Sequence, residues 1–442
     1  MQLETYDVVV IGAGPAGLLA AGRAAMLGAR VLLLEKMEKP ARKLRITGKG
    51  RANVTSMKPL ADYLEEIQPE PRFLRPAFGA FFNQDLVDLL EQCGVATKTE
   101  RGGRVFPASD RAWDIAEALV GWARRQGVEL VNQARVDGLI IEDGRLRGVR
   151  ASLPHAGASR RIDARCVVVA TGGRSYPGTG STGDGYGFAQ AAGHRIETPR
   201  PSLVDLQTDP AFPEAKGLRL RNVQLTLWVD GRKQESEFGE AEFTDQGLDG
   251  PTVLRLSRRI VQALAAGRGV EVVLDLKPAL DPAKLEARLL RELERLRAGT
   301  CRDLLRSLLP PQLVASFVRT LGLDPAAPAA RLPKGGRAAL LRLLKELRFR
   351  VVGHGGWEKA IVTAGGVSLK EIEPGTLASR KVANLHFAGE VLDLDANTGG
   401  FNLQIAFSTG WLAGEAAALS LGFGAGRPLP ASAPAARDRT AW

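Results

Sequence analysis

The sequence predicts an α/β protein in which a dinucleotide-binding Rossmann domain is interrupted by a long insertion. Three observations support this fold class. A strand, a glycine-rich turn, a helix and a second strand follow one another in residues 7–36. A β-rich stretch and then a helical stretch, rich in leucine and arginine, occupy residues 199–348. Apolar runs that end in glycines return after Ile361, so we expect the chain to come back and complete its first domain.

The first glycine-rich turn has the spacing of a dinucleotide fingerprint. The apolar run Val8–Ile11 leads into GAGPAG, in which each glycine has its own task. Gly12 turns the chain off the strand, Gly14 lets the backbone approach a pyrophosphate, and Gly17 lets the helix pack close to the sheet. The helix that starts near Pro15 offers its N–H groups and the positive end of its dipole to phosphates. A glycine-rich loop without a ligand is the competing interpretation, and the flanking strand and helix argue against it.

An acid stands where such a fingerprint needs one. The second apolar run, Val31–Leu34, ends in Glu35, 18 residues beyond Gly17. A carboxylate there can accept hydrogen bonds from a ribose 2′-OH, and it would repel a 2′-phosphate. NADP is therefore disfavoured as the ligand of this site, but the fingerprint alone does not separate FAD from NAD.

Composition and cysteine spacing exclude several classes of protein. The 442 residues, 45% of them hydrophobic and 25% charged, fit a globular protein of two or three domains. No apolar stretch reaches the roughly 20 residues of a membrane span, and Glu4 and Asp7 replace the basic start of a signal peptide. We therefore expect a cytoplasmic protein without a membrane partner. Cys93, Cys166 and Cys301 lie far apart and never in C-x-x-C spacing, so neither a metal site nor disulfide reductase chemistry is expected.

The positive charge of the chain is concentrated in one segment. The formal net charge is +11, and residues 251–350 alone hold 20 Lys and Arg against 9 Asp and Glu. The rest of the chain is therefore neutral as a whole. One interpretation is a set of solvated helices that happen to be rich in arginine. The other is an electrostatic footprint for nucleic acid or another polyanion.

A basic loop with several glycines follows Glu35. The segment RKLRITGKGRANVT spans residues 42–55, and we expect it to fold back over the phosphates and ring of the cofactor, using Lys43, Arg51 and Asn53. Beyond this loop, apolar periodicity predicts helices over residues 83–93 and 113–126, and a hairpin of strands over residues 134–142 and 148–151.

A second glycine-rich turn follows the buried run Cys166–Ala170. The run stops at Thr171-Gly172-Gly173, which we expect to be the second contact with the cofactor. The next residues, RSYPGTGSTGDGYG, repeat the G-x-G-x-x-G spacing at Gly178, Gly180 and Gly183. Because no strand precedes this repeat, it predicts an active-site or substrate loop and not another dinucleotide site.

The insertion has two parts. Residues from Pro199 to about Leu276 contain short β-rich runs, which predict a small separate β domain. Residues 280–348 show leucines at helical spacing, which predict a helical core. The arginines that fall outside these leucine stripes are the candidates for binding RNA: Arg288, Arg291, Arg295, Arg302 and Arg306.

The last part of the chain supplies the third expected contact with the cofactor. A strand over residues 385–388 leads to a Gly389-Glu390 turn, and a Gly399-Gly400 loop precedes an apolar helix that starts near Asn402. The segment from Gly389 to Asp393 would lie along the ribityl and pyrophosphate. The helix N-terminus would stabilise negative charge on a reduced flavin. NAD would use only the first of the three contacts, so their combination favours FAD.

These motifs together resemble the YhiN/BaiN-like (aminoacetone oxidase-like) FAD-dependent flavoprotein family. The matching stretches are GAGPAG, RKLRITGKGRANVT, ATGGRSYPGTGSTGDGY, TAGGV and GEVLDLDANTGGFNLQIAFSTG. The resemblance implies a two-dinucleotide-type Rossmann FAD domain that is discontinuous, with an inserted β-barrel domain and a small helical domain. The family often has Cys where Ala52 stands, so no thiol chemistry is expected in that loop.

The expected boundaries and cofactor contacts follow from the motifs and the resemblance. The FAD domain would comprise residues 1–198 and 352–423, the β-barrel domain 199–278 with part of 349–362, and the basic helical domain 279–348; residues 424–442 would form a disordered tail. The expected FAD contacts are Gly12, Gly14, Pro15, Ala16, Gly17, Glu35, Lys36, Lys43, Arg51, Asn53, Val136, Thr171, Gly172, Gly173, Gly389, Glu390, Asp393, Gly400, Phe401 and Asn402.

The resemblance also implies an activity. We expect an FAD-dependent oxidoreductase that passes hydride from NAD(P)H to an electron-poor C=C bond, with a uridine of ribosomal RNA as the favoured substrate. NAD(P)H would bind transiently, because no second strand-preceded fingerprint exists. Such a reduction also needs a proton donor, for which Tyr176, His354 and Lys43 are candidates. The alternatives are a small-molecule enone reductase or amine oxidase, and a non-catalytic flavin-bearing RNA-binding factor.

Overall fold

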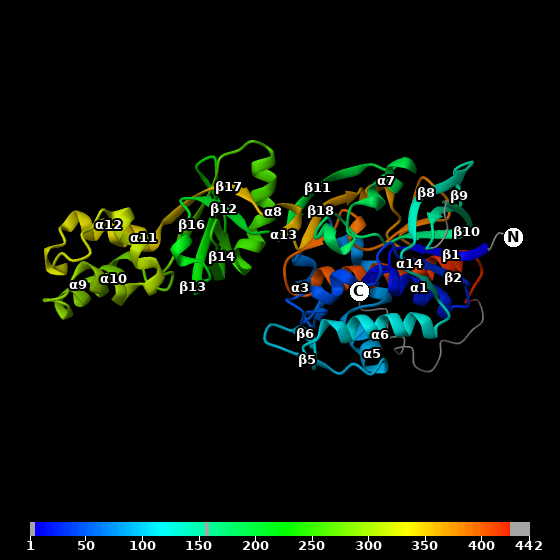
Figure 1. The fold of residues 1–442 in the computed structure, drawn as a ribbon, viewed down its shortest axis with the longest axis horizontal. Helices are drawn as coiled ribbons and strands as arrows, with labels where there is room; N and C mark the ends of the chain where they lie inside the picture. The colour runs from blue at the N-terminus through cyan, green and yellow to red at the C-terminus, as the bar shows by residue number, and fades with distance from the viewer. Residues whose placement is uncertain (1–4, 155–158, 425–442) are drawn as a thin grey trace. The chain divides into compact units, whose positions relative to one another are not determined.

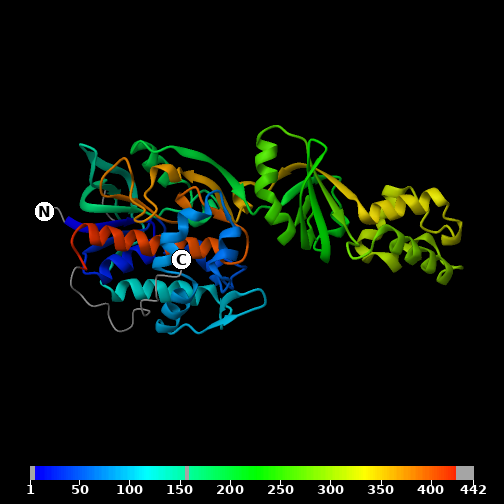
Figure 2. The ribbon, with the colours of Figure 1, turned by 180° about the vertical axis from the view of Figure 1, so that it is seen from behind.

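The computed structural model describes residues 5–154 and 159–424, which form two compact units (Figures 1 and 2). The first unit contains the described residues up to Pro199 and from Val362 onward, and the second comprises Arg200–Ile361. The tail that the sequence predicts to be disordered lies outside the described residues, apart from Gly424. No helix in the described part of the chain is long and apolar enough to cross a membrane.

The first unit is built on a mixed sheet with the strand order β7-β2-β1-β10-β9-β8, in which β19 also pairs with β10. Strands β7, β2, β1, β10 and β19 are parallel, whereas β9 and β8 are antiparallel to their neighbours. The bounds are β1 Thr5–Ile11, β2 Val31–Leu34, β7 Glu129–Val131, β8 Arg135–Glu142, β9 Arg145–Ser152, β10 Arg160–Val169 and β19 Leu385–Phe387. The strands predicted at residues 8–11, 31–34, 166–170 and 385–388 are thereby confirmed.

The register brings four loops to one edge of this sheet. Ile11 pairs with both Leu34 and Val169, and Val169 pairs with Phe387. Because the carboxyl ends of parallel strands meet at one edge, the loops that follow these four residues lie beside one another. Those loops carry the glycines and the acids that the sequence predicts as cofactor contacts.

Two helices from opposite ends of the chain cover the sheet together. Helix α1 (Pro15–Met26) packs against α14 (Phe401–Ser420) at very short range, because a Cβ on Gly410 or Gly414 would lie 2.2 or 2.1 Å from the carbonyl oxygen of Ala16 or Ala20. The other elements of this unit are α2 Arg42–Ile46, α3 Leu60–Glu65, α4 Arg75–Ala80, α5 Asn83–Gln92, α6 Ala112–Arg125, α7 Asp184–Ala191, β3 Thr55–Ser56, β4 Ile67–Gln68, β5 Thr97–Thr99, β6 Arg104–Pro107, β11 Ile196–Ser202, β18 Val362–Val367 and β20 Asp395–Ala396.

The second unit contains a closed barrel with the strand order β12-β15-β14-β13-β16-β17. Its strands are β12 Leu206–Asp209, β13 Arg219–Val229, β14 Arg232–Phe243, β15 Gly247–Asp249, β16 Val270–Asp275 and β17 Leu347–His354. Between β16 and β17 the chain forms α9 Pro282–Arg295, α10 Cys301–Leu308, α11 Pro311–Leu321 and α12 Lys334–Lys345, and α13 Gly356–Lys359 follows β17. Figure 1 shows α9 to α12 gathered together.

One element of the second unit differs from the sequence prediction. The segment predicted as a run of β elements contains the helix α8 (Pro251–Ala265). Its buried residues Val253, Leu256 and Ile260 recur at helical spacing, and this periodicity overrides the β-rich character of the flanking residues. The predicted leucine core of the later helices is confirmed, since Leu285 and Leu344 are fully buried.

Candidate functional site

The first glycine turn has the geometry that a bound dinucleotide requires. Gly12 adopts a φ of +97°, and a Cβ there would lie 2.7 Å from the carbonyl oxygen of Ala170. A Cβ on Gly17 would lie 1.8 Å from the carbonyl oxygen of Gly12. In contrast, no described atom lies within 4 Å of the Cβ position of Gly14. The chain therefore leaves open the backbone position that a pyrophosphate would approach.

Glu35 is anchored beside this turn. Its Oε2 accepts a hydrogen bond from the Ala13 N–H at 2.9 Å, and its Oε1 accepts one from the Met37 N–H at 2.8 Å. Burial raises the pKa of Glu35, while these two backbone hydrogen bonds act to lower it. A carboxylate has further lone pairs, so the anchored group can still accept hydrogen bonds from ribose hydroxyls.

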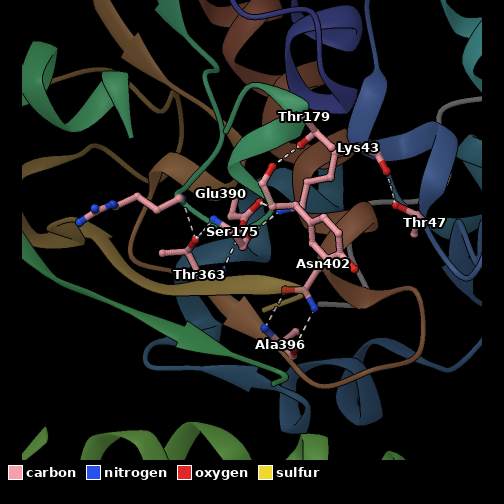
Figure 3. Close-up of polar contacts among 10 residues, drawn as sticks. Lys43, Thr47, Ser175, Thr179, Thr363, Glu390, Ala396 and Asn402 are labelled. Carbon is pink, nitrogen blue, oxygen red and sulfur yellow. Dashed lines mark hydrogen bonds and ion pairs between the residues drawn. The ribbon is translucent and has the colours of Figure 1, made fainter. Parts of the chain in front are cut away.

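Three distant segments meet in a polar network (Figure 3). The Lys43 ammonium donates to Ser175 Oγ at 2.6 Å and to Glu390 Oε2 at 2.8 Å. The Ser175 hydroxyl and the backbone N–H of Thr363 both donate to Glu390 Oε1, each at 2.8 Å. The Glu390 carboxylate thus receives three donors, and the charges of Lys43 and Glu390 compensate each other.

The same network fixes the loop after the second glycine turn. The Thr363 hydroxyl oxygen accepts hydrogen bonds from the backbone N–H groups of Arg174 and Ser175, at 2.8 and 3.2 Å. A Cβ on Gly173 would lie 2.4 Å from this oxygen, so only glycine fits there. Ser175 and Thr363 are fully buried. Neither residue is among the contacts predicted from the sequence.

We call the loops that carry the predicted cofactor contacts the cradle. Two buried polar atoms in the cradle lack partners among the described residues. Asn53 Oδ1 and Thr171 Oγ1 have no hydrogen-bond partner among the described residues. Both residues belong to the cofactor contacts predicted from the sequence. A buried polar atom without a partner costs roughly 1–3 kcal/mol, so such atoms indicate a ligand that completes the hydrogen bonding. FAD, with its ribityl hydroxyls and ring N–H, fits this pair and the open position at Gly14.

The comparison with known families agrees with this geometry. The family described as "HI0933-like protein Rossmann domain" matches residues 6–416. The chain belongs to this family of FAD-binding Rossmann proteins.

Three curated relatives cover nearly the whole chain of this HI0933-like protein. The 3-dehydro-bile acid delta(4,6)-reductase of Clostridium scindens is 32% identical over 414 residues, 92% of this chain and 98% of the relative. The ribosomal RNA dihydrouridine synthase of Escherichia coli is 30% identical over 92% of this chain and 97% of the relative. That of Haemophilus influenzae is 28% identical over 91% and 96%. The chain is an FAD-dependent oxidoreductase.

Several predicted contacts of this HI0933-like protein are engaged by the chain itself. Lys36 Nζ donates to Thr182 Oγ1 and, at 2.6 Å, to Asp184 Oδ2. The Arg51 guanidinium binds Asp110 and Glu100. These two cations therefore fix loops of the protein, a role that their position in the sequence did not predict.

The start of helix α14 is shaped by its own side chains. Gly400 has a φ of +93° and precedes the helix. Asn402 Oδ1 accepts from the Ala396 N–H at 2.9 Å, and its Nδ2 donates to the Ala396 carbonyl at 2.7 Å, so its amide braces the preceding turn (Figure 3). Phe401 is buried, with its ring centroid 4.7 Å from that of Tyr63.

The remaining predicted contacts lie in the cradle or the sheet beside it. Gly389 has a φ of +78°, and its N–H donates to Thr409 Oγ1 at 2.9 Å. A Cβ on Gly389 would lie 2.8 Å from the Cβ of Ala16, so the two turns touch. Asp393 donates its N–H to the Val367 carbonyl at 3.1 Å. Val136 is buried in β8.

The three candidate proton donors lie in different surroundings. Lys43 belongs to the polar network. Tyr176 directly follows Ser175 of that network in the chain, has a φ of +53° and exposes 38% of its surface. His354 lies on β17 in the second unit, where its Nδ1 accepts a hydrogen bond from the Gly356 N–H at 3.1 Å. Burial lowers the pKa of His354. A neutral ring with its proton on Nε2 is therefore favoured.

The candidate RNA-binding arginines lie on two helices of the second unit. Helix α9 carries Arg288, Arg291 and Arg295, and α10 carries Arg302 and Arg306. All are exposed except Arg288, which is half-buried. Arg295 pairs with Glu292 at 2.7 Å.

Proposed function

We propose that this protein reduces an electron-poor C=C bond with hydride that NAD(P)H delivers through FAD, and that its substrate is a uridine of ribosomal RNA. The observation that carries this proposal is the concentration of the positive charge in residues 251–350, outside the segments that hold the cradle. Contacts with a phosphate backbone need such a surface. The two relatives named ribosomal RNA dihydrouridine synthase support the same substrate. A cytoplasmic location follows from this substrate.

The residues of the chain would divide the work between holding the cofactor and handling the proton. Bound FAD supplies hydride transfer. The pyrophosphate would bind at Gly14 and the N-terminus of α1, and a ribose would bind to Glu35. FAD would also supply hydrogen-bond partners for Asn53 Oδ1 and Thr171 Oγ1. The N–H groups at the start of α14 would favour negative charge near the ring. The other predicted contacts with FAD are part of this proposal. The predicted domain boundaries are part of it as well.

Lys43 and Tyr176 are the stronger candidates for the proton donor. Reduction of uracil adds hydride at one carbon and a proton at the next, so an acid must hold a proton near the ring. Lys43 Nζ carries protons and is positioned by Ser175 and Glu390. His354 is weaker, because its Nδ1 already accepts a hydrogen bond and its neutral form is favoured.

The test compares ribosomal RNA from cells with and without the gene. We expect dihydrouridine to disappear from one site when the gene is deleted, and to return with the wild-type gene but not with Gly14→Ala. The purified protein should carry FAD, and NADH or NADPH should bleach its absorbance under anaerobic conditions. Unchanged dihydrouridine in the deletion strain would contradict the RNA substrate.

A small-molecule enone is the second candidate substrate. The specific observation is the 32% identity to the bile acid reductase over 98% of that relative. In this case the purified enzyme would oxidise NAD(P)H in the presence of a conjugated steroid ketone, and removing the arginines of α9 and α10 would leave that rate unchanged.

A further inference from the structure

The helical part of the second unit contains a hollow of about 400 Å³ between α9 and the segment that leads into α12. The residues that line it are Leu290, Leu293, Glu294, Arg297, Ala330, Leu332 and Arg337. It lies entirely within residues 279–348, all of which the structure describes. None of the five arginines predicted as RNA contacts lines it.

The lining combines an apolar surface with positive charge. Leu290 is 43% exposed, whereas Leu285 and Leu289 of the same helix are buried in the core. Arg297 is exposed and Arg337 is half-buried. Among the described residues, neither guanidinium has a recorded hydrogen bond or ion pair. The site thus holds two guanidinium groups that make no ion pair with any described residue, beside the partly exposed side chain of Leu290.

The surroundings strengthen the positive charge. Arg291 follows the lining residue Leu290, and Arg331 and Lys334 flank the lining residue Leu332; all three cations are exposed. Glu294 is the acid in the lining, so the hollow and its rim are strongly cationic as a whole. A neutral apolar ligand would leave this charge unused, whereas a polyanion with apolar faces would use both features.

We infer that this hollow holds a nucleotide of single-stranded RNA. An unstacked base presents an apolar face that can lie on Leu290 and Leu293. The adjoining phosphates would bind Arg297 and Arg337, and guanidinium planes also stack on bases. Glu294 can accept a hydrogen bond from a base amino or imino group. This inference rests on the proposed function, because it supplies the seat for the RNA strand that carries the reduced uridine.

The hollow has a different role from the predicted arginines that lie away from it, such as Arg302 and Arg306 on α10. Exposed arginines scattered over α9 and α10 attract RNA at long range but do not fix the position of the strand. A hollow that combines leucine side chains with two guanidinium groups adds a defined binding position. Two variants that lose the same charge, one in the hollow and one on α10, therefore distinguish a defined RNA-binding site from a general electrostatic attraction. The quantity to compare is their loss of affinity for RNA.

The experiment uses the full-length FAD-bound protein and a labelled oligouridine of about 12 nucleotides, titrated over a series of salt concentrations. The variant Arg297→Ala/Arg337→Ala should bind roughly tenfold more weakly, and the slope of log K against log salt should fall by about 1.4. The matched pair Arg302→Ala/Arg306→Ala removes the same charge outside the hollow and should lose less than about threefold. Leu290→Ser should lose about threefold with no change in slope.

Two outcomes of the binding experiment would overturn the inference. One is an equal loss of affinity in the two arginine pairs. The other is competition by inorganic polyphosphate that matches oligouridine phosphate for phosphate, which would indicate a general polyanion surface. Ribosomal RNA dihydrouridine is measured in cells that carry each variant. If the wild-type gene and the hollow variant restore dihydrouridine equally well, the inference about the hollow fails and the proposed function stands. If the wild-type gene does not restore dihydrouridine, the proposed function fails, and the binding data still test the hollow.

Discussion

The chain contains the spacing G-x-G-x-x-G twice, and the two copies have different structural roles. The first copy, residues 12–17, joins β1 to α1, and two of its glycines are in contact with backbone atoms that cannot move aside. In the second copy, residues 178–183, no described atom lies within 4 Å of the Cβ position of Gly178. The same letters thus mean close contact with backbone atoms in the first copy, whereas in the second copy the Cβ positions of Gly180 and Gly183 face the side chains of Met37 and Arg174. The strand that precedes the first copy makes the difference.

The second copy depends on side chains that reach it from the first region. Lys36 follows the acid of the fingerprint and binds Thr182 and Asp184. A Cβ on Gly180 would lie 2.8 Å from the Cγ of Met37. The second loop is therefore attached to the fingerprint by flexible side chains, and we expect it to tolerate changes that the first loop does not.

The largest effect is expected from Gly17→Ala. The added methyl would lie 1.8 Å from the carbonyl oxygen of Gly12, so α1 must shift from the sheet. We expect a loss of about 3 kcal/mol or more in the free energy of unfolding, measured by urea denaturation, together with loss of FAD. The matched variant Gly178→Ala should unfold like the wild type. Equal stability of the two variants would remove the distinction between the loops.

Gly14→Ala should separate ligand binding from folding. Gly14 has a φ of −81°, which alanine adopts without strain, and the position is open. The apoprotein should keep its stability within about 0.5 kcal/mol. The methyl would occupy the space of the pyrophosphate, so the Kd for FAD, measured by flavin fluorescence, should rise at least tenfold. Gly187→Ala, also at an open position in the first unit, serves as the control and should leave the Kd unchanged.

Ser175→Ala should have an intermediate effect. It removes one donor to Glu390 and one acceptor from Lys43 inside a fully buried position. We expect a cost of about 1–2 kcal/mol in unfolding free energy. Thr179 belongs to the same loop and is half-buried, and among the described residues its hydroxyl donates to the Tyr176 carbonyl alone, in an exposed hydrogen bond, so Thr179→Ala should cost less than about 0.5 kcal/mol. A smaller loss for Ser175→Ala than for Thr179→Ala would contradict the network.

The smallest effect is expected from Lys36→Met. The side chains of Lys36 and Asp184 are 23% and 29% exposed, so their pair should contribute at most about 1 kcal/mol. Burial acts to raise the pKa of Asp184, but hydrogen bonds from Lys36 and Thr182 hold it below 3.8. Because the folded pKa is depressed, this stability is present above the unfolded pKa and lost as the pH falls through the folded value. Between pH 7 and pH 3 the melting temperature should therefore fall less in Lys36→Met than in the wild type. In Lys36→Arg it should fall as much as in the wild type.

The sequence predicts what is local and misses what is assembled from distant segments. The strands over residues 8–11 and 31–34 and the tasks of Gly12 and Gly17 follow from neighbouring residues, and the structure has them. The bonds from Lys43 to Ser175 and to Glu390 join residues 132 and 347 positions apart, and no periodicity marks such pairs. The helix α8 could have been found, since its buried residues recur at helical spacing within an otherwise β-rich stretch.

Predicted contacts also differ in how far the sequence could define them. Asn402 stands at the start of the predicted helix, but its amide is used by Ala396. Arg51 belongs to a basic loop beside the cradle, yet its partners Glu100 and Asp110 come from a hairpin about 50–60 positions later. A residue's place in a motif indicates the loop on which it lies, whereas the direction of its side chain depends on partners elsewhere in the chain.

The close packing of α1 on α14 has a consequence for biosynthesis. Helix α1 is synthesised before the second unit, whereas Gly410 and Gly414, which cover its Ala16 and Ala20 backbone, are made after the entire second unit. At about 5–20 residues per second, this interval amounts to tens of seconds. During that time the side of α1 that faces α14 has no permanent cover. The predicted cofactor contacts at Gly389 and at the start of α14 are therefore added to those of the first glycine turn only after the second unit has been synthesised.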